Sequence, residues 1–249
     1  MQVKDRVAAV TGSGQGIGEG IARALADAGA SVVVNDVVAE RAQAAAGGLS
    51  SNGSRVLAVA ADVGTKEGAE ALVTQTVKHF GRLDILVNNA GIARDAWMSK
   101  MSDEDWDEVL RINLKSQFLC CRAAGAHMME QRSGRIVNIS SRAWLGGPGQ
   151  VNYAASKGGV VSLTRTLALE LAKFGVTVNC VAPAIVDTDL FRGLREDIQE
   201  RLLKSVPLGR IGTPADIAHA VLSFACDEAS YVTGQVLYVC GGRSLGGSS

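Results

Sequence analysis

The sequence has little that would indicate a metal centre, disulfides or a membrane segment. Its five cysteines form no CxxC pair and its three histidines show no HxxxH spacing, so we expect free thiols and no metal site. No uncharged apolar run approaches the ~18 residues that a membrane span needs. The stretch MQVKDRVAAVTG lacks the charged-then-apolar layout of a signal peptide. We therefore expect a cytoplasmic protein.

An excess of charge is also absent, because 25 basic side chains balance 25 acidic ones. Such a chain has no electrostatic footprint for nucleic acid or an anionic membrane, so we expect neither as a partner. At 249 residues and 47% hydrophobic content, the chain can bury one large core. We expect one domain over residues 1–249, in which residues 241–249 form a short polar tail.

What the sequence does contain is a regular alternation of apolar runs and helical patterns. Runs that are apolar throughout are typical of parallel strands covered on both faces. The expected strands are Arg6–Gly12, Ser31–Asp36, Arg55–Asp62, Leu83–Gly91, Gly134–Ser141, Val176–Pro183 and Gly234–Gly242. The expected helices are Gly16–Gly29, Lys66–Phe80, Asp103–Asn113, Lys115–Gln131 and Val151–Phe174. The alternation predicts an α/β fold with a doubly wound parallel sheet of about seven strands and helices on both faces.

A glycine-rich turn, TGSGQGIG, joins the first strand to the first helix. Its Gly12, Gly16 and Gly18 fit GxxxGxG rather than the usual GxGxxG spacing. Glycines permit a tight turn and let a pyrophosphate approach free N–H groups at a helix N-terminus. The turn therefore predicts a dinucleotide site, although a glycine-rich turn can also bind nothing.

Asp36 ends the second strand, 18 residues beyond Gly18. An acid near that distance can accept hydrogen bonds from both ribose hydroxyls of adenosine. It would also repel a 2′-phosphate, since two like charges ~4 Å apart cost roughly 4 kcal/mol at an effective dielectric of ~20. The glycine turn offers no basic side chain to offset this, so we expect NAD rather than NADP. Asp62 ends the third strand and is a candidate for the adenine amino group; an ordinary turn aspartate is the alternative.

The segment VNYAASKGG places Tyr153 and Lys157 one helical turn apart among small residues. The spacing alone is common on helix surfaces, but the small neighbours would allow a ligand to pack closely. An ammonium ~5 Å from a phenol oxygen favours the phenolate by ~3 kcal/mol. This would lower the pKa of Tyr153 from ~10 towards ~8 and make it a general acid/base.

Taken together and in order, TGxxxGxG, the NNAG of Asn88–Gly91, a serine ending the fifth strand, and YxxxK resemble the short-chain dehydrogenase/reductase family over essentially the whole chain. The resemblance implies a Rossmann-type fold and hydride transfer between a nicotinamide and a ketone or secondary alcohol. It implies that Tyr153 moves the proton on the substrate oxygen, that Lys157 lowers its pKa and binds the ribose, and that Asn113 holds a water in the proton relay.

The resemblance also implies that Asp62 and Val63 contact adenine, that NNAG lines the cofactor, and that Val186 and Thr188 hold the carboxamide. We expect cofactor contacts from Gly12, Gln15, Gly16, Ile17, Gly18, Asp36, Asp62, Val63, Asn89, Ala90, Gly91, Tyr153, Lys157, Pro183, Val186 and Thr188. We expect Ser141, Trp144 and Tyr153 to face the substrate; simple loop packing is the alternative for Trp144.

The sequence departs from the family at two places. Pro183 is followed by Ala184 where the family usually has glycine; alanine is small, so we expect the cofactor to fit. The catalytic serine is Ser141 when counted along the fifth strand but Ser140 when counted back from Tyr153. A strand should hold its register better than a loop, so we choose Ser141.

NNAGIARD and MSDEDWDEVLRINL resemble the beta-ketoacyl-acyl-carrier-protein reductase branch of the family. That branch often has a basic residue where Phe174 stands, and many members lack the acid at Asp36 and use NADPH. Our expectation is an NAD-linked ketone reductase or alcohol dehydrogenase. The alternatives are an NADPH-dependent ketoacyl-carrier-protein reductase and a catalytically silent dinucleotide sensor. The resemblance also implies a homotetramer, which the small, apolar faces of the helix at Ser156–Leu171 would suit.

Overall fold

The computed structural model describes residues 1, 3–50 and 54–245. Seven parallel strands form one sheet in the order β3-β2-β1-β4-β5-β6-β7. They are β1 Val7–Val10, β2 Ser31–Asp36, β3 Val56–Ala60, β4 Ile85–Asn88, β5 Gly134–Ile139, β6 Val176–Pro183 and β7 Val236–Val239. The predicted single-domain doubly wound fold is confirmed. Most strands are shorter than predicted, because the turn residues at their ends leave the ladder.

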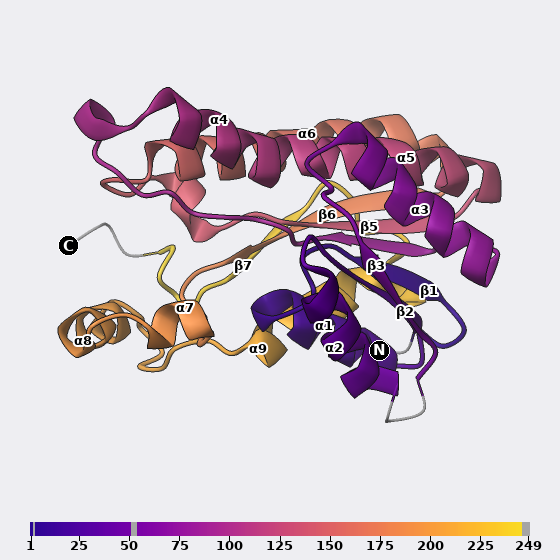
Figure 1. Ribbon diagram of the computed structural model, residues 1–249, viewed down its shortest axis with the longest axis horizontal. Coiled ribbons are helices and arrows are strands. Elements are labelled where there is room, and N and C mark those ends of the chain that lie inside the picture. Colours follow the sequence, from indigo (N-terminus) through magenta and orange to yellow (C-terminus); the bar gives the residue numbers. More distant parts are fainter. Residues whose placement is uncertain (2, 51–53, 246–249) are drawn as a thin grey trace.

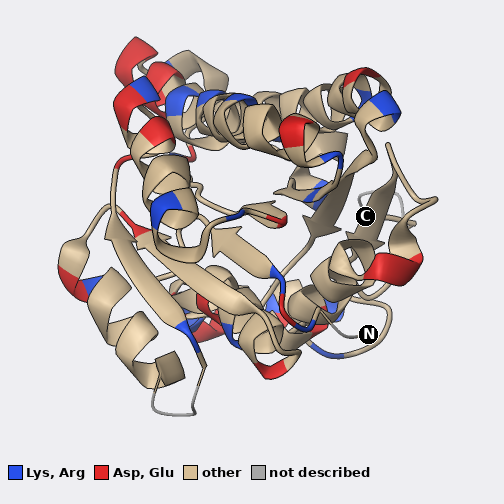
Figure 2. Ribbon diagram, turned by 90° about the vertical axis from the view of Figure 1, so that its right-hand side faces the viewer, with Lys and Arg blue, Asp and Glu red and all other residues tan. Residues whose placement is uncertain are grey.

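Helices cover both faces of this sheet (Figures 1 and 2). They are α1 Gly16–Asp27, α2 Ala39–Ser50, α3 Lys66–Phe80, α4 Asp103–Leu110, α5 Ser116–Gln131, α6 Val151–Leu171, α7 Asp189–Arg192, α8 Glu196–Lys204 and α9 Pro214–Ala225. One face carries α1, α2 and α9, and the other carries α3, α5 and α6. Alternation along each strand feeds both cores: Val10 joins the first, whereas its neighbour Ala9 joins the second.

Four of these helices, α2, α7, α8 and α9, are absent from the sequence prediction. The segment of α2, AERAQAAAGGLS, is rich in alanine and glycine and gives little contrast between its faces. The start of α9 does carry a signal: Thr213 and Asp216 form a capping box, with Pro214 in the first turn. The predicted C-terminal tail is described only as far as Leu245, where residues 241–245 form turns; its remainder lies outside the described residues.

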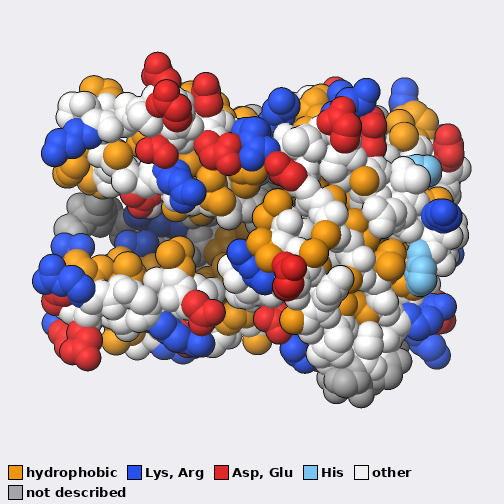
Figure 3. All heavy atoms as spheres, in the orientation of Figure 1, with side chains coloured by type: hydrophobic (Ala, Val, Ile, Leu, Met, Phe, Trp, Pro, Cys, Tyr) orange, Lys and Arg blue, Asp and Glu red, His pale blue; other side chains and the backbone are white. Residues whose placement is uncertain are grey.

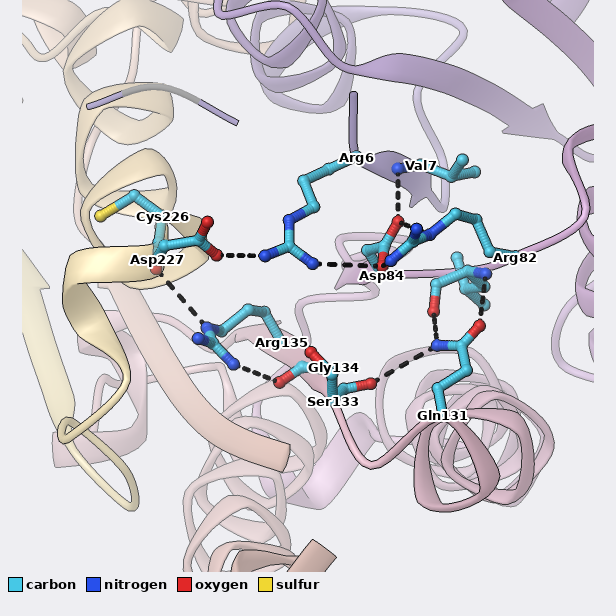
Figure 4. Close-up of polar contacts among 11 residues, drawn as sticks. Arg6, Val7, Arg82, Asp84, Gln131, Ser133, Gly134, Arg135, Cys226 and Asp227 are labelled. Carbon is cyan, nitrogen blue, oxygen red and sulfur yellow. Dashed lines mark hydrogen bonds and ion pairs between the residues drawn. The ribbon is translucent and has the colours of Figure 1, made fainter. Parts of the chain in front are cut away.

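The amino ends of the strands are tied together by charged side chains (Figure 4). Buried Asp84 accepts hydrogen bonds from the backbone N–H of Val7, at 2.8 Å, and from the guanidinium of Arg82. Arg6 also reaches Asp84 and pairs with Asp227 beyond α9. The cavity there is only about 10 Å³, so this edge is filled and closed.

Within the described residues, no helix is both long and apolar enough to cross a membrane.

Candidate active site

The predicted site residues gather at the opposite, carboxyl edge of the sheet. Because all strands are parallel, every strand ends at this edge, and the segments that follow them meet there. Figure 3 shows a hollow at this edge, between the lobe of α4 and α6 and the lobe of α7 and α8. Basic side chains are visible inside it (Figure 3).

The turn between β1 and α1 has the close packing that requires glycine. Gly12 and Gly16 take φ values of +59° and +62°, and a Cβ on Gly12 would lie 2.9 Å from the Cα of Ala90. A Cβ on Gly18 would collide with the carbonyl oxygen of Gly12. Any larger side chain would therefore displace the loop.

The NNAG segment braces this turn. Asn89 donates from Nδ2 to the carbonyl oxygens of Thr11, at 3.0 Å, and Gly12, at 2.9 Å. The hydroxyl of Thr11 accepts the backbone N–H groups of Asn89 and Ala90. Gln15 caps α1 without a side-chain hydrogen bond, which leaves the first N–H groups of α1 available for a pyrophosphate. Ile17 packs against the core beneath.

Asp36 is 6% exposed and faces the glycine turn. Its Oδ1 accepts the N–H of Val38 at 3.0 Å, and a Cβ on Gly14 would lie 2.6 Å from its Oδ2. The second oxygen is therefore directed at the turn. The same Gly14 lies against the exposed Arg41 of α2, a basic neighbour that the sequence analysis did not identify.

Asp62 follows β3, and its carboxylate is already engaged. Oδ2 accepts Arg111 at 2.8 Å, and Oδ1 accepts the N–H of Gly64 at 2.8 Å. Each oxygen keeps a second lone pair, so an amino group can still bind. Arg111 was not identified from the sequence, and its pairing with the aspartate after β3 becomes clear only in the fold. Val63 is buried in the core on the α3 side.

The segment after β6 returns to the glycine turn. Val186 forms a bridge with Gly212, and the Cγ2 of Thr188 lies 3.7 Å from the Cβ position of Gly16. The strand ends at Pro183, and Ala184 donates its N–H to Val239 without taking a positive φ. Alanine is thus accommodated where the family usually has glycine, because no left-handed conformation is needed.

The two candidate serines differ in what they bind. β5 ends at Ile139, so both lie just beyond the strand rather than at its end. Ser140 is 3% exposed and donates to the backbone carbonyl of Lys157 at 2.8 Å. Ser141 accepts the N–H of Ala143 and so caps the short 3₁₀ helix Arg142–Leu145. It also acts on the phenol of Tyr153, whose pKa it lowers. Because the Ser140 hydroxyl is engaged by the backbone of Lys157, Ser141 remains the candidate partner of Tyr153.

Burial nevertheless raises the pKa of Tyr153 overall, and the charge of Asp95 adds to this effect. The prediction that Lys157 lowers the pKa of this phenol towards 8 is therefore wrong. The ammonium lies over the ring face, 5.7 Å from its centroid, and donates to the carbonyl oxygen of Ile139 at 2.9 Å. Desolvation of the phenolate, which the sequence does not display, is the largest cause of the raised pKa.

Lys157 is itself 3% exposed, and burial lowers its pKa to about 8. One of its three N–H donors is engaged with Ile139, which leaves two for ribose hydroxyls. A Cβ on Gly91 would lie 3.4 Å from this ammonium and 3.2 Å from the Oδ1 of Asn113. The end of β4, the lysine and the asparagine therefore converge.

Asn113 lies in a π-helical turn, Arg111–Lys115, which joins α4 to α5. Such turns often mark functional sites. Its Oδ1 accepts the N–H of Ile92 at 2.8 Å, while Nδ2 donates to the carbonyl of Ile92 and the hydroxyl of Ser156. Both amide hydrogens are used, so a water at this residue would bind an oxygen.

Trp144 stacks on Tyr238 of β7 with ring centroids 6.4 Å apart, and it packs near Val160. This contact favours loop packing over substrate binding as the role of Trp144. It also joins the 3₁₀ helix to β7. Beside β7 lies a cleft of about 510 Å³, lined by Ile185, the loop before α9 and residues 238–242. Tyr153 and Ser141 do not line that cleft, so it adjoins the predicted centre rather than containing it.

This arrangement agrees with comparisons of the whole chain. Residues 12–244 match a family model described as enoyl-(acyl carrier protein) reductase. The chain belongs to the short-chain dehydrogenase/reductase family, in the branch that includes 3-oxoacyl-[acyl-carrier-protein] reductases. It is an oxidoreductase acting on ketone and alcohol groups.

Several relatives match nearly end to end. The chain is 50% identical to the (2S)-[(R)-hydroxy(phenyl)methyl]succinyl-CoA dehydrogenase subunit BbsD of Thauera aromatica, covering 98% of this chain and 99% of that protein. It is 43% identical to the 3-oxoacyl-[acyl-carrier-protein] reductase FabG of Chlamydia muridarum, covering 96% and 98%. Among solved structures, levodione reductase superimposes with a TM-score of 0.93 at 34% identity, covering 98% and 99%.

Membership of this family implies a nicotinamide cofactor, which supplies or accepts the hydride when bound. The glycine turn, the uncapped start of α1 and the free donors of Lys157 suit a dinucleotide. Among the described residues, no group of three or more His, Cys, Asp or Glu side chains could hold a metal.

Proposed function

We propose that this enzyme is NAD-linked and that Tyr153 exchanges the proton on the substrate oxygen. The observation that supports it most is the position of the buried Lys157 ammonium, 5.7 Å from the centroid of the Tyr153 ring. In reduction, the Ser141 hydroxyl donates to the carbonyl oxygen while Tyr153 protonates it. Lys157 holds a ribose with its free donors, and Asn113 positions the segment at Ile92.

The NAD preference rests on Asp36, whose free oxygen faces the glycine turn. Arg41 lies close enough to weaken this preference, because a guanidinium could pair with a 2′-phosphate. Asp36 is buried and Arg41 is exposed, so the fixed carboxylate should dominate. An NADPH-dependent 3-oxoacyl-carrier-protein reductase is the second candidate, favoured by the 43% identity to such a protein.

The substrate is proposed to be a ketone or secondary alcohol on an acyl thioester. The names of the BbsD and FabG relatives describe acyl groups on coenzyme A or acyl carrier protein. The test is a panel of acetoacetyl-CoA, its N-acetylcysteamine analogue and neutral cyclic ketones, assayed with NADH and NADPH. Thioester reduction with NADH at a kcat/KM at least tenfold above NADPH is the expected result. A preference for NADPH would favour the second candidate.

We further propose a cytoplasmic homotetramer. The cysteines at positions 120, 121, 180, 226 and 240 are free thiols, as a reducing compartment allows. At the outer edge of the sheet, β7 leaves Leu237 41% exposed, and Leu169 of α6 is 83% exposed. These apolar residues suit pairing between copies. Light scattering at micromolar concentration should give four times the chain mass, and a monomer would refute this assembly.

A further inference from the structure

Two arginines at the carboxyl edge lack acidic partners. Arg142 directly follows Ser141, and its Nε is buried without a hydrogen-bond partner. Arg243 follows β7 and donates from Nε to the hydroxyl of Ser205 at 2.9 Å. Within the described ranges, neither guanidinium has a carboxylate within ion-pair distance.

The fold brings these two arginines together. They follow β5 and β7, which flank β6, so both lie at the edge that carries Tyr153. The stack of Trp144 on Tyr238 holds the 3₁₀ helix of Arg142 against β7. The two charges also act on each other. Burial is the largest cause that lowers the pKa of Arg243, and the charge of Arg142 is the second.

A half-buried pair of like charges is unfavourable unless an anion neutralises it. Other partly buried arginines have partners within the chain: Arg6 and Arg111 meet the acids Asp84 and Asp62, and Arg135 donates to backbone carbonyls. Guanidinium groups present planar forks of donors that match a carboxylate. The missing partner is therefore expected to arrive with the ligand.

We infer that Arg142 and Arg243 form a subsite for an anionic group of the substrate, and that this group is a carboxylate a few bonds from the reacting carbon. The inference rests on the proposed function, because it assigns the substrate of the same centre. Arg142 adjoins Ser141 in the chain, which keeps the anion close to the carbonyl. The negative charge of Asp95 raises the pKa of Tyr153. The same charge would repel a substrate carboxylate and so favour its binding at the arginines.

The first test measures binding without turnover. The enzyme saturated with NADH is titrated calorimetrically with succinate, glutarate and inorganic phosphate. Succinate or glutarate should bind the wild type, and Arg142→Gln or Arg243→Gln should weaken this binding at least tenfold. Arg201→Gln is the matched control, because Arg201 is an exposed arginine of α8 and its substitution removes the same charge. The affinity of Arg201→Gln for succinate or glutarate should stay within about twofold of the wild-type value.

The second test uses a matched pair of ketones, 4-oxopentanoate and its methyl ester. The wild type should favour the acid in kcat/KM by at least tenfold, mainly through KM. Arg142→Gln should reduce this preference to within about threefold of unity, and Arg142→Lys should give an intermediate value because it keeps the charge but not the fork. Arg201→Gln should preserve the preference. Melting temperatures report folding, and Arg243→Gln repeats the test if Arg142→Gln does not fold.

The outcomes separate the two proposals. Equal use of acid and ester, or dicarboxylate binding that ignores both arginines, would overturn the subsite while leaving the dehydrogenase intact. If inorganic phosphate bound in a way that depends on the arginines and the dicarboxylates did not bind, the assignment of a carboxylate would also be overturned. The subsite would then be one for a phosphate group of the thioester carrier. If no thioester or ketone were turned over with either cofactor, the proposed function would fail, yet the succinate titration would still decide whether an anion binds here.

Discussion

The two edges of the sheet differ in how their arginines are paired with acidic side chains. At the amino edge, Arg6 and Arg82 meet Asp84 and Asp227, and the cavity is about 10 Å³ (Figure 4). At the carboxyl edge, Arg142 has no acidic partner, and a cleft of about 510 Å³ adjoins the site. Arg111 and Asp62 are paired at the carboxyl edge as well, so the contrast lies in Arg142 and Arg243, which we propose are left open for a ligand. The variants below test that division, which expects catalytic losses at one edge and stability losses at the other.

The largest effect should follow Tyr153→Phe. A positioned acid/base contributes about 10²–10⁴-fold, and the variant leaves no other phenol beside Lys157 among the described residues, so we expect the upper part of that range in lost kcat. Binding of NADH, followed by fluorescence titration, should stay within a few-fold, since Lys157 keeps its free donors. Tyr231→Phe is the control, because Tyr231 is fully exposed. Retained turnover in Tyr153→Phe would exclude the phenol as proton donor.

The neighbouring serines should separate catalysis from stability. Loss of a donor to a developing oxyanion costs ~10²–10³ in kcat, and we expect about two orders of magnitude for Ser141→Ala. Ser140 donates to the backbone of Lys157 instead. Ser140→Ala should therefore lose under tenfold in kcat and should lower the melting temperature more than Ser141→Ala does. The opposite pattern of rates would make Ser140 the catalytic serine.

Cofactor choice should change by one to two orders of magnitude in Asp36→Ala. Charge-assisted hydrogen bonds contribute about 1.5–3 kcal/mol, and their loss weakens NAD while the removed repulsion helps NADP. The ratio of kcat/KM for the two cofactors measures this. Arg41→Gln in the Asp36→Ala background should reverse part of the gain, because it removes the cation beside Gly14. If the wild type already prefers NADP, the assignment of Asp36 is wrong.

The sequence was sufficient to predict those elements whose local residue pattern directly reflects their burial. Strands covered on both faces must be apolar throughout, so all seven were visible, and each motif after a strand could be placed at one edge. Helix α2 was not visible, because AERAQAAAGGLS packs small residues and has no strong apolar stripe. Catalytic motifs were found because their residue types and spacing are local.

Long-range electrostatics could not be predicted in the same way. The partnership of Arg111 with Asp62 joins residues 49 apart, and the approach of Arg142 to Arg243 depends on β5 and β7 flanking β6. The pKa of Tyr153 depends on how deeply the phenol is buried, and that is a property of packing. The spacing of YxxxK predicts that the two side chains are neighbours, as the 5.7 Å between the Lys157 ammonium and the Tyr153 ring centroid confirms. It could not give the desolvation that raises this pKa.

The smallest expected effect belongs to the amino edge and should be confined to stability. Asp84→Asn keeps the shape of a 2% exposed side chain but weakens its bonds to the N–H of Val7 and to Arg82. Weakening such partnerships costs roughly 1–3 kcal/mol. The free energy of unfolding in urea should fall by that amount, with wild type and variant compared at one protein concentration because assembly shifts apparent stability. KM and kcat should stay within about twofold. A change in KM of tenfold or more, with stability unaltered, would show that the closed edge communicates with the site and that the division between the edges does not hold.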